Sequence, residues 1–286
     1  MNKSRIAILI DGGFFLKRLA HLVPEQKRDT PEKVVACIRN MCRNHIQRLT
    51  GTGDPKNTNG HKGDQKNWIQ HVYRIFFYDA HPYDGKAHHP LDNRQIDFGK
   101  SEVARFRTTL FELLRKERKL ALRLGKVSRD HDWIINPALT KKLLRTRQHL
   151  DVLQSIEQAR QENANGDGSI TLHLSPSDAE NLVKLYDFWQ AMDSKSVTLG
   201  LRQKGVDMRI GVDIASITLK RQADTIVLVA GDSDFVPASK LARREGLEFI
   251  LDPMWQQVND DLFEHIDGLQ SGLPRPNDKT SAASDS

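Results

Sequence analysis

The chain has little cysteine and no long apolar run. Its two cysteines, Cys37 and Cys42, would lie on different faces of a helix, which argues against a disulfide framework and against a cysteine-based zinc site. The apolar stretch at residues 6–10 stops at Asp11, well short of the hydrophobic segment of a signal peptide. No run has the length of a membrane span. We therefore expect a cytoplasmic protein with reduced thiols and no membrane partner.

The charge balance excludes few functions. Lys and Arg number 43 against 37 Asp and Glu, which gives a net charge of +6 and an isoelectric point near 9.3. This modest basic excess is compatible with a polyanionic partner, but many proteins without a nucleic-acid role share it. An apolar fraction of 38% is enough to build a buried core. Composition therefore indicates a globular protein and leaves its function open.

Five apolar segments predict the buried strands of a parallel sheet. The first, at residues 6–10, is apolar at every position, as in a strand that is covered on both faces. Amphipathic helices lie between the segments; one begins at Thr30-Pro31, and another covers residues 101–116. This alternation predicts an α/β fold with a central, mostly parallel sheet flanked by helices. The other four strands are expected at residues 71–78, 120–124, 225–230 and 247–251.

Three regions depart from this alternation. Residues 51–67, rich in Gly, Asn, Asp and Lys, predict a flexible loop. Residues 136–192 have a largely helical pattern, with a capping box at Ser177 and Glu180, and predict a helical insertion within a domain spanning residues 1–270. The polar residues 271–286, which include Pro and Ser, predict a disordered tail.

Acidic residues follow two of the predicted strands. Asp11 directly follows the first strand, and Asp232 and Asp234 follow the strand at residues 225–230. The carboxyl ends of parallel strands line one crevice, where gathered carboxylates would repel one another unless a divalent cation compensates. Mg²⁺ and Mn²⁺ are hard cations that suit an all-oxygen site and accept phosphate oxygens. The pattern therefore predicts a site for Mg²⁺ or Mn²⁺.

Two further acids lie in a predicted helix that reaches about residue 220. Asp207 and Asp213 have apolar neighbours, and an acid in such a setting either caps a helix or points into a site. We favour Asp207 as a third metal-site carboxylate, and for Asp213 both a metal ligand and a structural hydrogen-bonding role stay open. The earlier acids have an alternative too. Asp11 could belong to a turn, and Asp232 and Asp234 could cap the following helix.

These segments together resemble the NYN domain family. The resemblance rests on Ile-Leu-Ile-Asp-Gly-Gly-Phe at residues 8–14, Lys-Gly-Val-Asp at residues 204–207, and Val-Ala-Gly-Asp-Ser-Asp-Phe-Val-Pro at residues 229–237. The pattern is most similar to the LabA-like bacterial branch, which belongs with the PIN-like nucleases. The resemblance covers roughly residues 5–130 and 200–255.

The resemblance implies a PIN-like α/β fold and metal-dependent hydrolysis of phosphodiester bonds, with RNA a more probable substrate class than DNA. It assigns catalysis and metal binding to Asp11, Asp207, Asp232 and Asp234, which would hold one or two Mg²⁺ or Mn²⁺ ions. Many family members have an Asn shortly after the first Asp, where this chain has Gly13-Phe14-Phe15. A polar group that assists the first Asp is therefore missing from its usual place.

Polar residues beside these acids are candidates for binding RNA phosphates. The basic ones lie in the helix after Asp11, just before Asp207, or in the helix after Phe235. Ser233 could hydrogen-bond to a phosphate or to a metal-bound water. Each basic residue alone is more often part of a solvated helix face. The basic set is Lys17, Arg18, Arg202, Lys204, Lys240, Arg243 and Arg244.

Three other functions share parts of the pattern. Toprim-type nucleotidyl enzymes also carry Asp-x-Asp after an apolar strand, but they pair it with an early Glu, where this chain has Asp11. A phosphatase with an aspartyl nucleophile would carry Asp-x-Asp at the first strand, and Asp11-Gly12-Gly13 does not match it. A catalytically silent nucleic-acid-binding or regulatory scaffold of the same fold is the main alternative, because acids can persist as helix caps. The sequence does not fix the oligomeric state and is compatible with a homo-oligomer.

Overall fold

The computed structural model describes residues 5–52, 67–147, 157–158, 160–161 and 174–275. The chain divides into two compact units. The first unit comprises Met1–Gly85, Asp97–Ser128 and Gln203–Ser286, and the second comprises Lys86–Ile96 and Arg129–Arg202. Residues 53–66, which make up most of the loop predicted at residues 51–67, lie outside the described residues.

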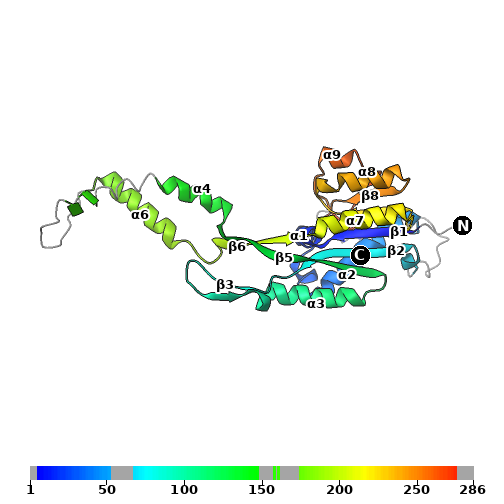
Figure 1. The fold of residues 1–286 in the computed structure, drawn as a ribbon, viewed down its shortest axis with the longest axis horizontal. Helices are drawn as coiled ribbons and strands as arrows, with labels where there is room; N and C mark the ends of the chain where they lie inside the picture. The colour runs from blue at the N-terminus through cyan, green and yellow to red at the C-terminus, as the bar shows by residue number, and fades with distance from the viewer. Residues whose placement is uncertain (1–4, 53–66, 148–156, 159, 162–173, 276–286) are drawn as a thin grey trace, which may run out of the picture. The chain divides into compact units, whose positions relative to one another are not determined.

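A seven-stranded sheet has the strand order β6-β5-β2-β1-β7-β8-β9 (Figure 1). The five pairs from β5 to β9 in this order are parallel, so the predicted α/β fold with a mostly parallel sheet is confirmed. All five predicted strands are present, whereas β6 and β9 were not predicted. The strands are β1 (Ile6–Asp11), β2 (Val72–His81), β5 (Leu120–Ile135), β6 (Val197–Lys204), β7 (Thr225–Val229), β8 (Glu248–Asp252) and β9 (Gly268–Leu269).

Successive strands of the sheet are added first on one side of β1 and then on the other. From β1 the chain continues to β2 and β5 on one side, and it later returns to place β7, β8 and β9 on the other side. Ile10 of β1 pairs with Val229 of β7, so the residues that follow these strands leave the sheet at the same edge. Open α/β sheets bind ligands at such a switch point.

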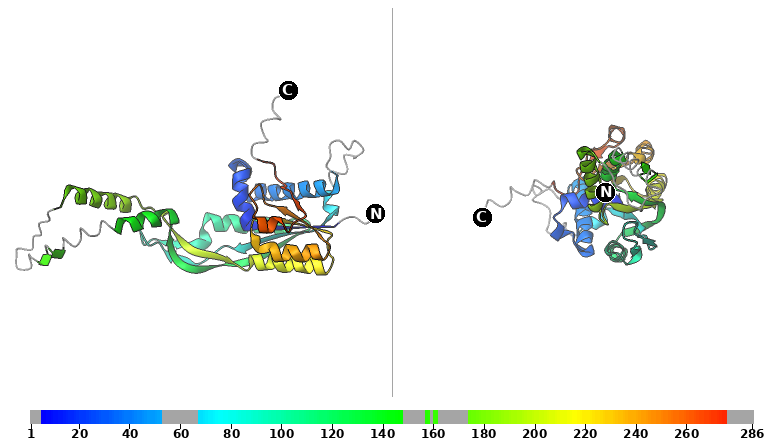
Figure 2. Two further views of the ribbon diagram at one scale, coloured as in Figure 1. Left: turned by 90° about the horizontal axis from the view of Figure 1, so that it is seen from above. Right: turned by 90° about the vertical axis from the view of Figure 1, so that its left-hand side faces the viewer.

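Helices cover both faces of the sheet in the first unit (Figures 1 and 2). Ile6, Ile8 and Ile10 pack with helices α1, α2 and α3 on one face, and Ala7 and Leu9 pack with α7, α8 and α9 on the other. Burial on both sides explains why β1 is apolar at every position. The helices are α1 (Gly12–Leu22), α2 (Pro31–Thr50), α3 (Glu102–Lys116), α7 (Val206–Leu219), α8 (Val236–Arg244) and α9 (Asp260–Phe263). Short 3₁₀ turns are η1 (Glu25–Lys27), η3 (Trp68–Gln70), η4 (Phe98–Lys100) and η6 (Ser233–Phe235).

The second unit holds helices α4 (Pro137–Arg145) and α6 (Pro176–Gln190) and most of a small sheet of β3 (Lys86–His88) and β4 (Gln95–Asp97). It is wider than the insertion predicted at residues 136–192, and it includes parts of strands as well as helices. Residues 148–156, 159 and 162–173 of that predicted insertion lie outside the described residues.

Helix starts follow capping signals in the sequence. The Thr30 side chain accepts a hydrogen bond from the Lys33 backbone N at 3.4 Å, as the Thr-Pro signal predicts. For α6 the capping prediction was wrong by two residues. Ser175, rather than Ser177, is the N-cap and accepts from the Asp178 backbone N at 3.1 Å, because Pro176 suits the first helical turn.

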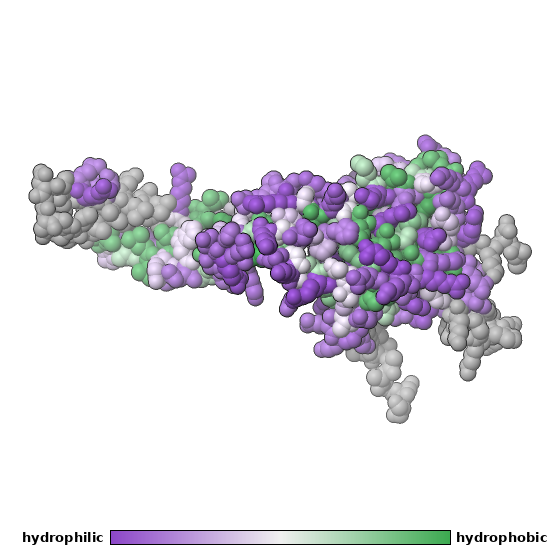
Figure 3. Space-filling view, turned by 60° about the horizontal axis from the view of Figure 1, so that its bottom comes forward, coloured by the Kyte–Doolittle hydropathy of each residue, from purple (hydrophilic) through white to green (hydrophobic). Residues whose placement is uncertain are grey.

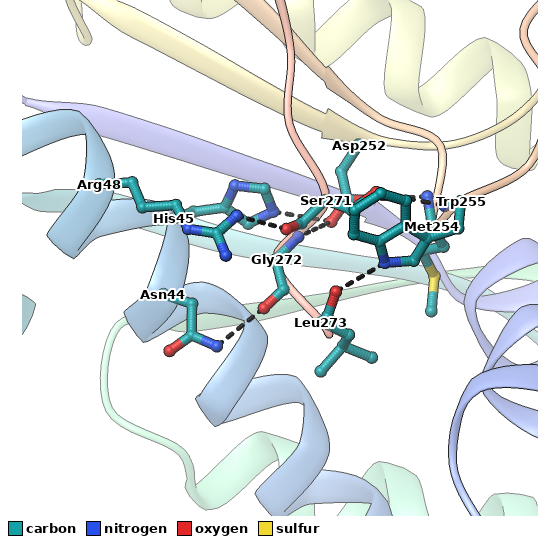
Figure 4. A network of polar contacts seen from close by, with 9 residues as sticks. All are labelled: Asn44, His45, Arg48, Asp252, Met254, Trp255, Ser271, Gly272 and Leu273. Atoms are coloured by element: carbon teal, nitrogen blue, oxygen red, sulfur yellow. Dashed lines mark hydrogen bonds and ion pairs between the residues drawn. The ribbon is translucent and has the colours of Figure 1, made fainter. Parts of the chain in front are cut away.

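The C-terminal segment stays packed beyond the tail boundary predicted at residue 271. The buried carboxylate of Asp252 accepts hydrogen bonds from His45 Nε2 at 2.7 Å and from the Gly272 backbone N at 2.9 Å (Figure 4). Trp255 Nε1 donates to the Leu273 carbonyl at 2.7 Å, and Leu273 is buried. Residues 271–275 therefore belong to the fold, and residues 276–286 lie outside the described residues. Among the described helices, none combines the length and apolar character needed to cross a membrane.

Candidate active site

Asp11 ends β1 and caps the next helix. Its Oδ1 accepts a hydrogen bond from the Phe14 backbone N at 3.1 Å, which makes it the N-cap of α1. Burial raises the pKa of Asp11 to about 6; the N–H groups of Phe14 and Gly13 oppose this shift, and the charges of Asp207 and Asp79 add to it. Capping α1 therefore does not prevent Asp11 from also being part of the acidic site.

Asp207 lies in the first turn of α7. The helix begins after Gly205, whose φ of 77° is left-handed and favours glycine. Burial raises the pKa of Asp207, and the negative charges of Asp232 and Asp234 raise it further. Asp207 is therefore not the cap of α7, and its carboxylate lies within electrostatic range of the acids after β7.

Asp232 and Asp234 occupy the turn between β7 and α8. Asp232 caps η6 by accepting a hydrogen bond from the Asp234 backbone N at 3.1 Å. Phe235 is buried in the core and anchors this turn, while both acids are exposed. A short anchored turn thus holds two carboxylates at the switch point of the sheet.

Asp79 is a fifth acid near this edge, and the sequence reasoning missed it. It follows Tyr78, which pairs with Asp11 in the neighbouring strand, and its buried carboxylate forms an ion pair with Arg107 of α3. Burial raises the pKa of Asp79, while Arg107 and the Ala80 N–H oppose the shift. A signal for Asp79 was present in the sequence, because this residue also follows an apolar strand segment.

Asp213 has partners of a different kind. It lies six residues after Asp207, or about 9 Å further along the helix axis, and accepts hydrogen bonds from the Tyr78 hydroxyl at 2.9 Å and from Arg123 Nε at 3.2 Å. These contacts join α7 to β2 and β5. Of the two roles left open for Asp213, these contacts support the structural hydrogen-bonding role.

Gln203 stands beside Asp11, where the sequence lacks a polar residue. A Cβ atom on Gly13 would lie 3.4 Å from Asp11 Oδ1 and 3.4 Å from Gln203 Oε1. The end of β6 therefore brings a side-chain amide next to the first acid. Sequence reasoning could not find Gln203, because β6 itself was not predicted.

Electrostatic effects link four of the predicted acids. The negative charge of Asp207 raises the pKa of Asp11, and the charges of Asp232 and Asp234 raise the pKa of Asp207. Among the described residues, however, no group of three or more His, Cys, Asp or Glu side chains is arranged to hold a metal ion. The acids come from the ends of two central strands and the start of one helix, as the sequence predicted for three of these four.

Residues 147–266 match the NYN domain. The matched segment contains Asp207, Asp232 and Asp234, and it begins after Asp11. It also includes α6, which the resemblance seen in the sequence did not cover. NYN domains are nucleases, so the match supports nuclease chemistry in general.

Other comparisons add little to the NYN match. No curated protein matches the chain. A crystal structure of a protein of unknown function from Vibrio parahaemolyticus is 12% identical, with a TM-score of 0.35 over 95% of this chain and 96% of that chain. A likeness this weak supports no conclusion about function.

Several basic residues predicted to bind RNA have partners within the protein. Arg18 donates to the Met254 carbonyl at 2.9 Å, and Arg243 binds Asp267 at 2.8 Å. Arg244 pairs with Glu245 at 3.5 Å, and Arg202, in the second unit, pairs with Asp130 at 3.8 Å. The contacts of Arg18 and Arg243 hold loops in place, so these two are weaker candidates for binding phosphate than the sequence indicates.

The remaining predicted polar residues lie close in sequence to Asp11, to Asp207, or to Asp232 and Asp234. Lys17 on α1, Lys204 at the end of β6 and Lys240 on α8 are exposed. Ser233 is half-buried within η6, between Asp232 and Asp234. These four stay candidates for phosphate contacts.

A groove of about 750 Å³ lies against Asp207 and Asp234, between α7 and α8. Met208, which is 75% exposed, and Val212 form one apolar wall, and Pro237 lies in the other. Asp207 and Asp234 therefore adjoin an apolar surface as well as solvent.

Gly12 allows the chain to turn closely past β2. A Cβ atom at this position would stand 2.6 Å from the Phe77 ring and 2.6 Å from the Tyr78 carbonyl. We therefore expect Gly12→Ala to lower the free energy of unfolding by about 1 to 3 kcal/mol, the usual cost of overpacking, as measured by urea denaturation.

Gly211 is the matched control for Gly12, because a Cβ there would meet nothing within 4 Å. Gly211 lies inside α7, where Ala is preferred to Gly by up to about 1 kcal/mol. Gly211→Ala should therefore be neutral or stabilising. Equal losses of stability in the two variants would contradict the packing argument for Gly12.

Proposed function

We propose that this protein is a metal-dependent nuclease of the LabA-like, PIN-like kind that hydrolyses RNA. The observation that carries the proposal is the electrostatic effect of Asp207 on Asp11, and of Asp232 and Asp234 on Asp207, at the switch point of the sheet. Unpaired carboxylates held this near one another are unfavourable. A bound cation would compensate the repulsion between these carboxylates.

The acids have the donor chemistry for Mg²⁺ or Mn²⁺, because all their ligand atoms are carboxylate oxygens. Asp11 is half-buried and is fixed by the hydrogen bond that it accepts from the Phe14 N–H, while Asp207, Asp232 and Asp234 are exposed and can adjust around an ion. When bound, the cation would lower the pKa of a water and stabilise charge on the phosphate.

The chain's own residues would position the substrate. Ser233 offers a hydroxyl between Asp232 and Asp234. Lys17, Lys204 and Lys240 would add salt-dependent attraction for the backbone. The apolar walls beside Asp207 and Asp234 would take an unpaired base, which supports a single-stranded substrate in preference to a closed duplex.

The test is cleavage of end-labelled single-stranded RNA with Mg²⁺, with Mn²⁺ and with EDTA. We expect activity only with a cation, and a loss of more than about 100-fold in Asp234→Asn, because losing a metal ligand should exceed the roughly 10- to 100-fold cost of losing a group that only supports one. Asp29→Asn is the matched control because Asp29 is exposed and pairs with Lys33 at 2.7 Å. Full activity of Asp234→Asn, or activity in EDTA, would refute the assignment.

A catalytically silent binding scaffold is the second candidate. It is favoured by the caps that Asp11 and Asp232 provide, and by the lack of a ready-made metal cluster among the described residues. This alternative predicts RNA binding without cleavage under any cation. A filter-binding assay beside the cleavage assay separates the two functions.

A further inference from the structure

Helices α4 and α6 of the second unit carry apolar side chains that the described residues leave uncovered. Neither helix has a fully buried residue among those described; Leu144 of α4 is 69% exposed and Tyr186 of α6 is 63% exposed. Figure 3 shows apolar side chains on the surface of this part of the chain. Helices of 9 and 15 residues draw most of their stability from packing an apolar face. Among the described residues, nothing covers that face of either helix.

On α4 the uncovered face forms a groove. About 630 Å³ of space lies between the helix and the end of β5, over a floor that includes Ile134, Pro137 and Leu144. Lys141 and Arg145 lie among the lining residues. The groove is thus apolar at its base and positively charged at its rim.

On α6 the uncovered face forms a ridge. Val183, Tyr186 and Trp189 are spaced three residues apart, which places them along one stripe of the helix, and all three are largely exposed. Asp187 follows Val183 by four residues and therefore lies beside the same stripe. The ridge is apolar along its crest and acidic at its side.

The two helices are complementary in charge. α4 carries three cations and no acid, whereas α6 carries three acids and one lysine. Opposite charges around an apolar contact fix its register and exclude other partners. The charged residues are Lys141, Lys142 and Arg145 on α4, and Asp178, Glu180, Asp187 and Lys184 on α6.

We propose that α6 of one copy lies in the α4 groove of a second copy, in a two-fold symmetric dimer. Among the described residues, the groove is open and the ridge is exposed, so no described segment, α6 included, fills the groove. A two-fold axis makes the exchange reciprocal, and the assembly closes with both ridges seated. The binding mode is that of an amphipathic helix in an apolar groove, and it does not depend on nuclease activity.

The test is sedimentation velocity on the full chain across a range of concentrations. We expect a dimer for the wild type. Leu144→Glu places an acid in the groove and Tyr186→Glu removes an aromatic anchor; because symmetry breaks each contact twice, either variant should raise the dimer Kd by about 100-fold or more. Val103→Glu is the matched control, since Val103 is 68% exposed on α3 of the first unit.

Mixing the two variants gives a sharper test. In a mixed pair, the intact α6 of the Leu144→Glu copy meets the intact α4 groove of the Tyr186→Glu copy, so one of the two contacts is restored. The mixture should therefore dimerise more tightly than either variant alone, and circular dichroism verifies that each variant is folded. A monomeric wild type, a dimer that survives both substitutions, or no gain on mixing would overturn the proposal.

Discussion

Asp11→Asn is expected to abolish most cleavage while leaving the protein at least as stable as the wild type. Asp11 is the most buried of the four proposed ligands, so its loss should exceed that of a supporting group and lower the rate by more than about 100-fold. The fold should survive because Asn is as good an N-cap as Asp. Its side-chain oxygen can keep the hydrogen bond from the Phe14 N–H that Asp11 accepts at 3.1 Å.

The stability of this variant follows from the pKa of Asp11. Folding raises that pKa from 3.8 to about 6, with burial as the main cause, so the folded state binds the proton more tightly than the unfolded state. The resulting stability is complete below about pH 4 and is lost as the pH rises through 6. At neutral pH the ionised carboxylate therefore costs on the order of 3 kcal/mol.

The measurement is urea unfolding of both proteins in EDTA at pH 4.5 and pH 7. Asp11→Asn should be the more stable protein at pH 7, and the difference should shrink at pH 4.5, where wild-type Asp11 is mostly protonated. Adding Mn²⁺ at pH 7 should stabilise the wild type more than the variant. A variant that is less stable at pH 7, or that cleaves RNA at the wild-type rate, would contradict this account.

Asp252→Ala should lower the free energy of unfolding more than Gly12→Ala does. The Asp252 carboxylate is fully buried and accepts hydrogen bonds from His45 Nε2, from the Met254 backbone N at 2.8 Å and from the Gly272 backbone N (Figure 4). Removing it leaves three buried donors without their acceptor. We expect the free energy of unfolding to fall by about 3 to 5 kcal/mol, a large share of the total for a typical domain.

The same substitution should release the C-terminal segment first. Hydrogen exchange at the amides of Gly272 and Leu273 should become fast in Asp252→Ala before the rest of the sheet is affected. Asp29→Ala is the control, since an exposed ion pair contributes little to stability. If Gly272 stayed protected in Asp252→Ala, the anchoring role of this carboxylate would be wrong.

The sequence predicted most of the sheet because burial on both faces leaves a simple signal. Residues 6–10 of β1 and 226–229 of β7 are apolar, and Asp11 and Asp232 lie at or shortly after the ends of these strands, so their shared edge could be inferred from the parallel arrangement. The helix start at Thr30 was found because capping is local, and the helix at residues 101–116 was found because its apolar side chains recur at helical spacing. These features depend on neighbours in sequence and need no knowledge of distant contacts.

Features that depend on distant contacts could not be predicted. β6 is buried in its first half and exposed in its second, so it lacks a continuous apolar run, and Gln203 was missed with it. The structural role of Asp213 requires Tyr78 and Arg123, which come from two other strands. The packing of residues 271–275 depends on a carboxylate about twenty residues earlier, and their polar composition by itself favoured a tail.

The pairing of β1 with β7 has a consequence for synthesis of the protein. Ile10 lies beside Val229, so the first strand leaves the ribosome long before the strand that covers one of its edges. At about 5 to 20 residues per second, translation of the intervening segment takes roughly 10 to 40 s. During that interval β1 has an open edge, and the acid cluster cannot be complete before the turn that follows β7 has been made.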